Sequence, residues 1–221
     1  MKKPLVIFGA GDIAQLAHYY FTNDSNYEVV AFTVDSAYIT EHDFCGLPIV
    51  PFEELTDHYS LDTHEVFIAL SYSKLNRIRQ QKYSAARTLG YRLASYVSSN
   101  ATVLNDTTIG DNCFVLEDNT IQPFVTIGNN VTLWSGNHVG HHSTIHEHCF
   151  ISSHVVVSGG VEIGESCFIG VNATLRDHIR IGERCVIGAG ALILADAEPE
   201  GVYIGRATER AKVPSTRLRN I

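Results

Sequence analysis

The chain has 221 residues, of which 45% are hydrophobic and 18% charged, a composition that excludes disorder over most of the length. Sixteen basic residues against 24 acidic ones give a formal net charge of −8, and no basic run stands out, so we expect no nucleic-acid-binding surface. The apolar stretch near the start breaks at Gly9, and no apolar run is long enough to cross a membrane. We therefore expect a soluble, cytoplasmic protein with no membrane partner.

The first residues carry a phosphate-loop pattern. Residues 4–8 are expected to form a buried strand, Gly9-Ala10-Gly11-Asp12-Ile13-Ala14 follows at once, and helical periodicity begins after it. Strand, Gly-x-Gly-x-x-Ala and helix in this order are typical of dinucleotide-type folds, which makes Gly9, Gly11 and Asp12 candidates for substrate binding. About 95 residues is half of a full fold of this kind, so a mononucleotide fits better than NAD. Glycines that only make a tight turn remain the alternative.

Further strands are expected after this loop. A second strand over residues 27–33 leads to Asp35, whose carboxylate is placed to bind a ribose or a base. A third strand over 66–70 leads to a polar segment with Lys74 and Arg77, which are candidates for binding the substrate, and then to another helix. A strand over 93–96 delivers the chain to its second half. We therefore predict a small, Rossmann-like α/β nucleotide-sugar-binding domain over residues 1–97.

A hexapeptide repeat fills the second half. From Ala101 the sequence divides into sixteen consecutive units of six, and the third position is a branched aliphatic residue in every unit, from Val103 to Ile193. Glycine often follows this position. Four of the five cysteines share the small first position, namely Cys113, Cys149, Cys167 and Cys185. Repeats of fixed period indicate a stacked architecture.

Three units of six make one 18-residue coil of a triangular parallel β-helix. The aliphatic residue fills the centre of each coil, and the small residue packs beside it. We therefore predict a β-helix domain with a C-terminal tail over residues 98–221. The cysteines are expected to be buried small residues rather than disulfides or redox centres.

The uninterrupted repeat resembles that of the left-handed β-helix acyltransferases, and this resemblance implies a homotrimer that uses acetyl-CoA or a related thioester. Both halves in this order resemble the bacterial sugar acyltransferases that include the bacillosamine-pathway N-acetyltransferase and the sialic-acid O-acetyltransferase family. In those proteins the N-terminal unit holds the nucleotide of a nucleotide-linked amino sugar. The stretch from Leu133 to Ser143 is most similar to members acting on dTDP-4-amino-4,6-dideoxyglucose.

Seven of the eleven histidines lie between residues 138 and 178. Three interpretations compete for them: a catalytic base, a metal site, and exposed corner residues without a role. The repeat register places His141 beside a corner, where a side chain can project into a groove between subunits. Family resemblance makes His141 the base, with His142 where relatives carry an acidic residue. Asp118, Asn137 or Glu147 could orient the ring instead. We expect no metal.

Gly159 follows His141 by one coil, and Gly160 comes next. We expect these glycines to leave space for the pantetheine arm of acetyl-CoA, with the Gly159 N–H bound to the thioester oxygen as charge develops on it. The resemblance places Trp134 where some relatives have a sugar-binding asparagine, so its ring is expected to stack on a deoxy sugar.

Other site candidates follow from position alone. His138 is expected to line the groove together with His142, and Asn137 is a candidate for holding the sugar or the cofactor. Arg206 and Lys212 in the tail are expected to pair with the phosphates of coenzyme A, although a solvated surface is equally compatible with them.

The expected reaction is acetyl transfer from acetyl-CoA to the C4 amine of a nucleotide-linked 4-amino-4,6-dideoxy sugar, with dTDP favoured over UDP, for surface polysaccharide such as O-antigen. Direct attack is expected, because no cysteine or serine is placed as an acyl carrier. The alternatives are a sugar O-acetyltransferase of the sialic-acid type, a metal-dependent β-helix enzyme and a non-catalytic nucleotide-binding trimer.

Overall fold

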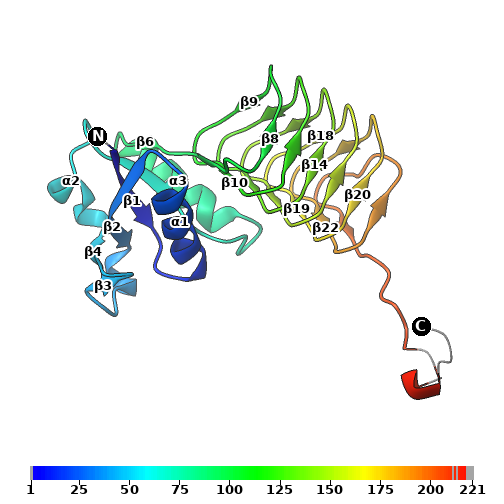
Figure 1. Ribbon diagram of the computed structural model, residues 1–221, viewed down its shortest axis with the longest axis horizontal. Helices are drawn as coiled ribbons and strands as arrows, with labels where there is room; N and C mark the ends of the chain where they lie inside the picture. The colour runs from blue at the N-terminus through cyan, green and yellow to red at the C-terminus, as the bar shows by residue number, and fades with distance from the viewer. Residues whose placement is uncertain (1, 211, 213, 218–221) are drawn as a thin grey trace.

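The protein folds into an α/β unit followed by a column of stacked coils (Figure 1). The structure is a computed structural model that describes residues 2–210, 212 and 214–217. This arrangement confirms the predicted fold class, a Rossmann-like unit joined to a left-handed parallel β-helix. No helix in the described part of the chain has the length and apolar character needed to cross a bilayer.

The α/β unit is built on a six-stranded sheet with the order β3-β4-β2-β1-β5-β6. Its strands are β1 (Lys3–Phe8), β2 (Tyr27–Val34), β3 (Asp43–Phe44), β4 (Leu47–Pro51), β5 (Glu65–Ile68) and β6 (Arg92–Leu93). Its helices are α1 (Asp12–Asn23), α2 (Leu55–His58) and α3 (Arg77–Thr88), and short 3-10 turns lie at Ser36–Tyr38, Phe52–Glu54 and, in the tail, Ser215–Arg217. All neighbouring strands pair in parallel except β3 with β4.

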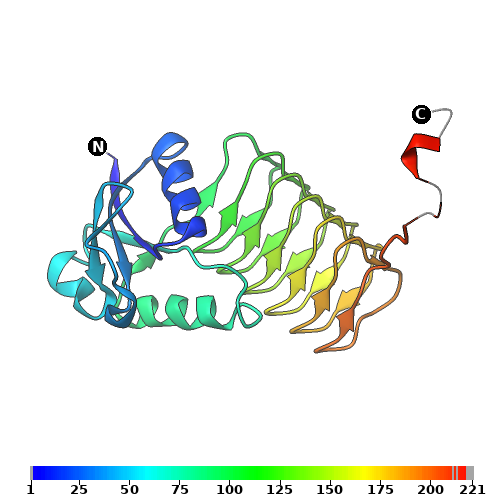
Figure 2. The same cartoon turned by 90° about the horizontal axis from the view of Figure 1, so that it is seen from below.

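The two long helices cover opposite faces of this sheet (Figure 2). Phe21 of α1 packs in one apolar cluster with Ile7 and Phe67, whereas Tyr83 of α3 packs in another with Val6 and Ile68. Because both faces are covered, the central strands β1 and β5 are apolar along most of their length, as parallel strands usually are. The hairpin formed by β3 and β4 was not expected from the sequence.

The coils stack their short strands into three flat faces, each joining strands 18 residues apart. Face 1 contains β7 (Tyr96–Val97), β10 (Phe114–Val115), β13 (Thr132–Leu133), β16 (Phe150–Ile151), β19 (Phe168–Ile169), β22 (Val186–Ile187) and β24 (Val202–Tyr203). Face 2 contains β8 (Thr102–Val103), β11 (Thr120–Ile121), β14 (His138–Val139), β17 (Val156–Val157), β20 (Thr174–Leu175) and β23 (Leu192–Ile193). Face 3 contains β9 (Thr108–Ile109), β12 (Thr126–Ile127), β15 (Thr144–Ile145), β18 (Glu162–Ile163) and β21 (Arg180–Ile181).

The second residue of each strand points into the column. Leu133, Ile151 and Ile169 of face 1 have no exposed surface, and each pairs with its equivalent in the next coil. The four repeat cysteines are likewise buried as free thiols, each donating its S–H to a backbone carbonyl. The repeat begins one unit earlier than the sequence division, because β7 already pairs with β10.

The α/β unit docks against face 1. Phe67 of β5 packs on Phe114 of β10 with ring centroids 5.3 Å apart, and the strand expected over 93–96 is divided into β6 and β7 as the chain passes from sheet to coil. Tyr96 and Phe114, two aromatic residues that face 1 turns outward, therefore form part of the core of the α/β unit. This docking places the carboxyl ends of β1 and β5 beside the coils.

Candidate active site

The glycine loop between β1 and α1 requires glycine at its first position. Gly9 has φ of +129°, and a Cβ there would lie 2.8 Å from the carbonyl oxygen of Ala69. Gly11 differs, because a Cβ built on it meets no atom within 4 Å. The chain's own packing therefore explains Gly9, whereas Gly11 faces open space in which a ligand can approach the backbone.

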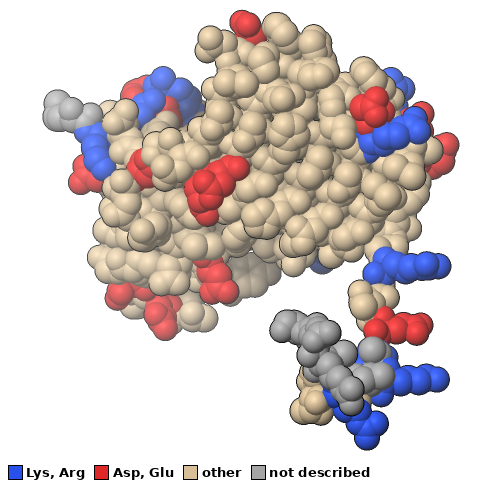
Figure 3. Space-filling view, turned by 45° about the vertical axis from the view of Figure 1, so that its right-hand side comes forward, with Lys and Arg blue, Asp and Glu red and all other residues tan. Residues whose placement is uncertain are grey.

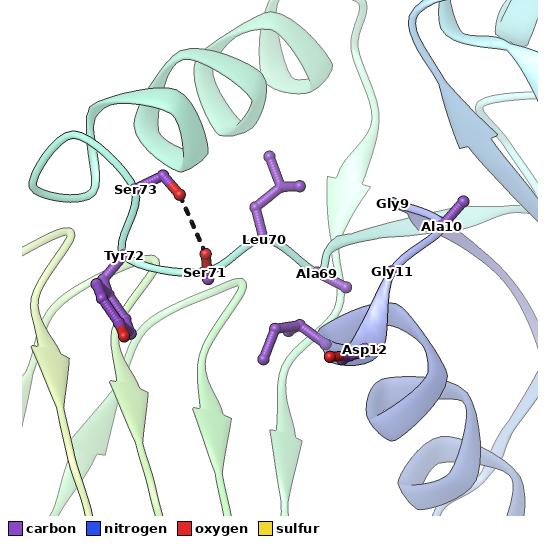
Figure 4. A pocket seen from close by; sticks show the side chains of 10 residues that line it. Gly9, Ala10, Gly11, Asp12, Ala69, Leu70, Ser71, Tyr72 and Ser73 are labelled. Carbon is purple, nitrogen blue, oxygen red and sulfur yellow. Dashed lines mark hydrogen bonds between the residues drawn. The ribbon is translucent and has the colours of Figure 1, made fainter. Parts of the chain in front are cut away.

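A cavity of about 490 Å³ lies over this loop and the start of α1. Its opposite wall is the segment after β5, where Ser71 and Ser73 hold their hydroxyl oxygens 3.3 Å apart (Figure 4). We call it the loop cavity. Lys and Arg do not occur among its lining residues, so a phosphate here would be held by backbone N–H groups, hydroxyls and the N-terminus of α1. The Asp12 carboxylate also lines the cavity and suits a hydroxyl or ammonium group better than a phosphate.

A second cavity of about 350 Å³ adjoins the first, sharing Gly9, Ala10 and Leu70. Asp35 lines it and forms an ion pair of 2.5 Å with Lys82 of α3. Tyr38 stands at its edge and is largely exposed. This side slot, with apolar walls and one polar pair, has the character of a nucleobase site.

A third cavity of about 210 Å³ continues the loop cavity toward the coils, sharing Ile13 and Tyr72 with it. Trp134, Phe150 and Val171 make most of its other walls, with the hydroxyls of Ser152 and Ser153 between them. We call it the coil cavity. The three cavities thus form one track from the α/β unit to face 1.

The segment between β5 and α3 is held in an unusual conformation. Lys74, Leu75 and Asn76 are consecutive and all have φ between 51° and 62°, which is costly for side chains other than glycine. Asn76 fixes the end of this turn, because it is fully buried and its side-chain amide donates to the carbonyl of Cys167 in a coil. Tyr72 packs its ring on Phe150 and Phe168 with centroids 4.9 and 4.8 Å away. The coils therefore hold in position the segment that forms this wall of the loop cavity.

Arg79 provides the deepest connection between the two units. Its guanidinium is buried and donates to Thr132 Oγ1 and to the carbonyls of His148 and Cys149, the last at 3.0 Å. Burial lowers the pKa of Arg79 to about 10, so the side chain stays charged at neutral pH. A buried cation held by coil carbonyls fixes α3, and with it Lys82, against face 1.

His141 lies at the corner between faces 2 and 3, away from the track on face 1. Its backbone N–H donates to Gln122 Oε1, and its Nδ1 lies 3.1 Å from Nδ1 of His142. One of these two nitrogens must carry the proton that the other accepts. His142 in turn packs on Phe124 with ring centroids 4.7 Å apart, so the pair is braced from the preceding coil.

None of the three residues expected as alternatives to orient His141 is hydrogen-bonded to its ring in the described structure. Glu147 accepts a hydrogen bond from Asn129 at 2.6 Å, and Asp118 belongs to a different corner. Asn137 is buried, donating to the carbonyl of Trp134 and accepting from the N–H of Val155 at 2.8 Å. Asn137 therefore has a structural place inside the coil rather than in a sugar groove.

The sequence predicted an empty channel beside His141 at Gly159, but the side chain of His141 occupies that space. The imidazole itself covers this glycine, since a Cβ at Gly159 would lie 2.7 Å from His141 Cε1. Gly160 is covered in the same way by His178, with a Cβ 2.5 Å from its Nδ1. The Gly159 N–H donates no hydrogen bond within the described residues and so is free to bind an incoming oxygen.

The remaining predicted residues lie apart from the track. Lys74 and Arg77 are exposed beside it without lining it, and His138 points outward from face 2. Arg206 and Lys212 are exposed on the tail, which leads away from the coils (Figure 1).

Sequence reasoning missed Lys82 and Tyr38 in the side slot, and Ser152 and Ser153 in the coil cavity. Ser71 and Ser73 of the loop cavity were also missed, although the sequence held a usable signal for them, because the carboxyl ends of neighbouring parallel strands lie at one edge of a sheet. Lys82 had none, since its partner Asp35 lies 47 residues away. Among the described residues, no group of three or more His, Cys, Asp or Glu side chains is arranged to hold a metal ion.

Comparisons with known proteins agree with this architecture. The bacterial transferase hexapeptide family (six repeats) matches residues 124–159 and 160–195, and the curated proteins give no match. The structure is similar to PerB from Caulobacter crescentus in complex with CoA and GDP-perosamine, with 24% identity, 91% of this chain and 94% of that chain covered, and a TM-score of 0.81. It is also similar to the acetyltransferase domain of PglB from Neisseria gonorrhoeae, with 25% identity, 89% and 93% covered, and a TM-score of 0.79.

WeeI from Acinetobacter baumannii is a third similar structure, with 18% identity, 92% and 97% covered, and a TM-score of 0.70. The matches span both units, so they confirm the order of the two folds as well as each fold. The resemblance to hexapeptide-repeat acetyltransferases, first seen in the sequence, is thereby confirmed at the level of the fold.

Proposed function

We propose that the protein is an acetyltransferase that moves the acetyl group of acetyl-CoA to the C4 amine of a nucleotide-linked 4-amino-4,6-dideoxy sugar. The observation that carries the proposal is the continuous track from the side slot through the loop cavity to the coil cavity. Its sections suit a base, a diphosphate and a sugar in that order. The neighbours bound to CoA and GDP-perosamine or to acetyl coenzyme A support the same class of reaction.

The sugar end of the track favours a deoxy sugar. Trp134, Phe150 and Val171 offer apolar surface that suits a methyl group, and Ser152 and Ser153 offer hydroxyls for the remaining ring oxygens. Asp35 and Lys82 together provide an acceptor and a donor for a base edge. A dTDP-linked sugar is our first choice and a UDP-linked sugar our second.

His141 is proposed as the base that takes the proton from the amine as it attacks the thioester. With Nδ1 donating to His142, Nε2 is left as the proton acceptor. The free N–H of Gly159 then binds the thioester oxygen, on which negative charge develops during attack. Direct transfer suits this corner, because the four repeat cysteines are buried in the coil interior.

A second copy of the chain completes this site in our proposal. The track opens along face 1, whereas His141 stands at the corner between faces 2 and 3 of the same chain. The strand residues that point outward from face 2 are uncharged, from Thr102 through Val156 to Leu192, and Val156 and Leu192 are exposed apolar residues. Figure 3 shows a broad surface over the coils with few charged side chains, as a subunit interface needs. We infer a homotrimer on this basis.

The test is acetyl transfer measured by thiol release from acetyl-CoA, with dTDP-, UDP- and GDP-linked 4-amino-4,6-dideoxy sugars as acceptors. The matched control is the same nucleotide sugar with a hydroxyl in place of the amine. Turnover that requires the amine supports the proposal. Thiol release with the hydroxyl acceptor alone would assign O-acetylation instead, and silence with every acceptor would overturn the acyltransferase assignment.

A further inference from the structure

Two histidines from different coils flank the Gly159–Gly160 corner. His141 precedes Gly159 by one coil, and its Nε2 would lie 2.9 Å from a Cβ built on that glycine. His178 follows Gly160 by one coil, and its Nδ1 and Cε1 would lie 2.5 and 2.8 Å from a Cβ built there. Because consecutive Cα atoms are only about 3.8 Å apart, the two rings lie over adjacent residues and bracket one short stretch of backbone.

The backbone holds both histidines in place. His178 donates its N–H to the carbonyl of Gly159 at 3.0 Å, and Gly160 donates its N–H to the carbonyl of His141 at 2.8 Å. His178 has φ of 55°, within the range of 50° to 66° found for the other corner residues of this kind, and its side chain is exposed. No hydrogen bond to its ring nitrogens occurs within the described part of the chain, so they are available to a ligand.

The charged and titratable groups around this corner differ on its two sides. On the side of the preceding coil, His141 is paired with His142. On the side of the following coil, Arg176 and Asp177 precede His178, and Asp196 stands one coil further on with an oxygen that accepts from the N–H of Arg180. Within the described part of the chain His178 is thus an imidazole without a hydrogen-bond partner, and it lies over Gly160, the residue next to Gly159, on the side opposite His141.

Acetyl transfer needs two proton movements at this place. The C–N bond forms as the amine nitrogen loses a proton, and the C–S bond breaks as the sulfur leaves with the electron pair. His141 accounts for the first movement in the proposed function, on which this inference rests. A sulfur that leaves beside Gly159 still needs a proton, and an imidazolium is a stronger acid than an alkyl thiol.

We propose that His178 is the proton donor to the leaving sulfur of coenzyme A. The proton on the attacking nitrogen passes to His141, and the proton on His178 passes to the sulfur, which gives an amide and a free thiol. His141 then returns its proton and His178 regains one through solvent, so the enzyme ends as it began. The two histidines work from opposite sides of the Gly159–Gly160 corner.

The test uses His178→Asn, because asparagine tolerates a positive φ and has no proton to transfer in this range. With acetyl-CoA and the amino sugar, we expect kcat to fall about 100-fold while KM for both substrates stays within about twofold. The alkaline limb of the pH profile of kcat should disappear, and the acidic limb, which reports the base, should remain. Thermal unfolding of the variant should match that of the wild type.

The decisive comparison is with the selenium analogue, acetyl-seleno-CoA, whose selenolate leaves without needing a proton. The loss in His178→Asn should shrink to a few-fold with this substrate if His178 donates a proton. His146→Gln is the control, because this exposed histidine contacts Glu162 near face 3 and should leave both rates unchanged.

An equal loss with both esters would assign His178 a positioning role and overturn proton donation, as would an unchanged kcat or an effect on KM alone. Absence of acetyl transfer by the wild-type protein would instead overturn the proposed function, and with it this inference.

Discussion

The two halves of the molecule differ in how far a single chain completes its candidate site. The α/β unit encloses the track with residues of its own and of the coils it docks on, down to the ion pair of Asp35 with Lys82. The β-helix carries its candidate chemistry at a surface corner, where His141 is exposed and Gly159 is half-buried. A binding track formed by one chain and a reactive corner elsewhere on its surface are what an active site shared between copies requires.

The largest effect is expected when two inactive variants complement each other, which tests whether the track of one copy works with His141 of another. His141→Ala alone should lower kcat about 1,000-fold, because the proposed base is removed. Gly11→Asp alone should be equally inactive, because a carboxylate would fill the space that the phosphates need. After the two variants are unfolded together and refolded, activity should return to a substantial fraction of the wild-type level.

The control for this experiment is each variant refolded by itself, which should stay inactive. Mixed assemblies that remain inactive, although mass measurement shows both chains in them, would place His141 and the track in one chain.

Removing the buried cation should loosen the docking of the two units. Arg79→Ala removes the donor to the His148 carbonyl and to the Thr132 hydroxyl and one of the two donors to the Cys149 carbonyl, and it leaves a void beneath Phe150. We expect a loss of about 3 kcal/mol in unfolding free energy, measured by denaturant titration. Arg77→Ala, two residues away and exposed, is the matched control and should cost no more than about 0.5 kcal/mol. Equal effects of the two substitutions would contradict the docking role.

Substituting the two glycines of the glycine loop should have different effects on the stability of the protein. Gly9→Ala forces a methyl group toward the carbonyl of Ala69 at a positive φ, so we expect a loss of about 2 kcal/mol in unfolding free energy. Gly11→Ala should leave stability nearly unchanged, because no atom lies near its Cβ, yet it should weaken binding of the nucleotide diphosphate. Calorimetric titration with the nucleotide measures the second effect. Unchanged affinity in Gly11→Ala would contradict the proposal that the nucleotide diphosphate lies against the backbone at this position.

The smallest expected effect is a pH dependence within the coils. His148 is buried, and burial lowers its pKa; its Nδ1 meets the side-chain amide of Asn130 at 2.9 Å. Because the folded protein binds this proton less readily than the unfolded chain, the stabilisation is present above the unfolded pKa of about 6.5 and is lost as the pH falls below it.

The melting temperature measured from pH 7.5 to pH 5 should therefore fall less steeply in His148→Asn than in the wild type. The matched comparison is His154→Asn, an exposed corner histidine with nearly the same φ, which should keep the wild-type slope. Identical slopes in all three proteins would show that His148 does not contribute to the acid sensitivity.

Much of the fold could be predicted because its determinants are local and repeated. The aliphatic residue at every third position of six defines the coil, and the glycine loop after a buried strand defines the turn into α1. The candidate site was harder to predict than the fold, because residues at the same position of different repeats have different neighbours. Asn137 occupies a first position like Cys149, and only the coil geometry shows that its amide is used internally.

The sequence by itself determined the two folds, their order and the corner position of His141, because these follow from short-range periodicity and steric limits on the backbone. The tertiary structure alone decided what surrounds each residue. It buried Arg79 in the docking face, fixed the turn at Lys74–Asn76, paired Asp35 with Lys82 and set His178 over Gly160. These contacts join residues far apart in the chain, and packing across faces, rather than any local preference, brings them together.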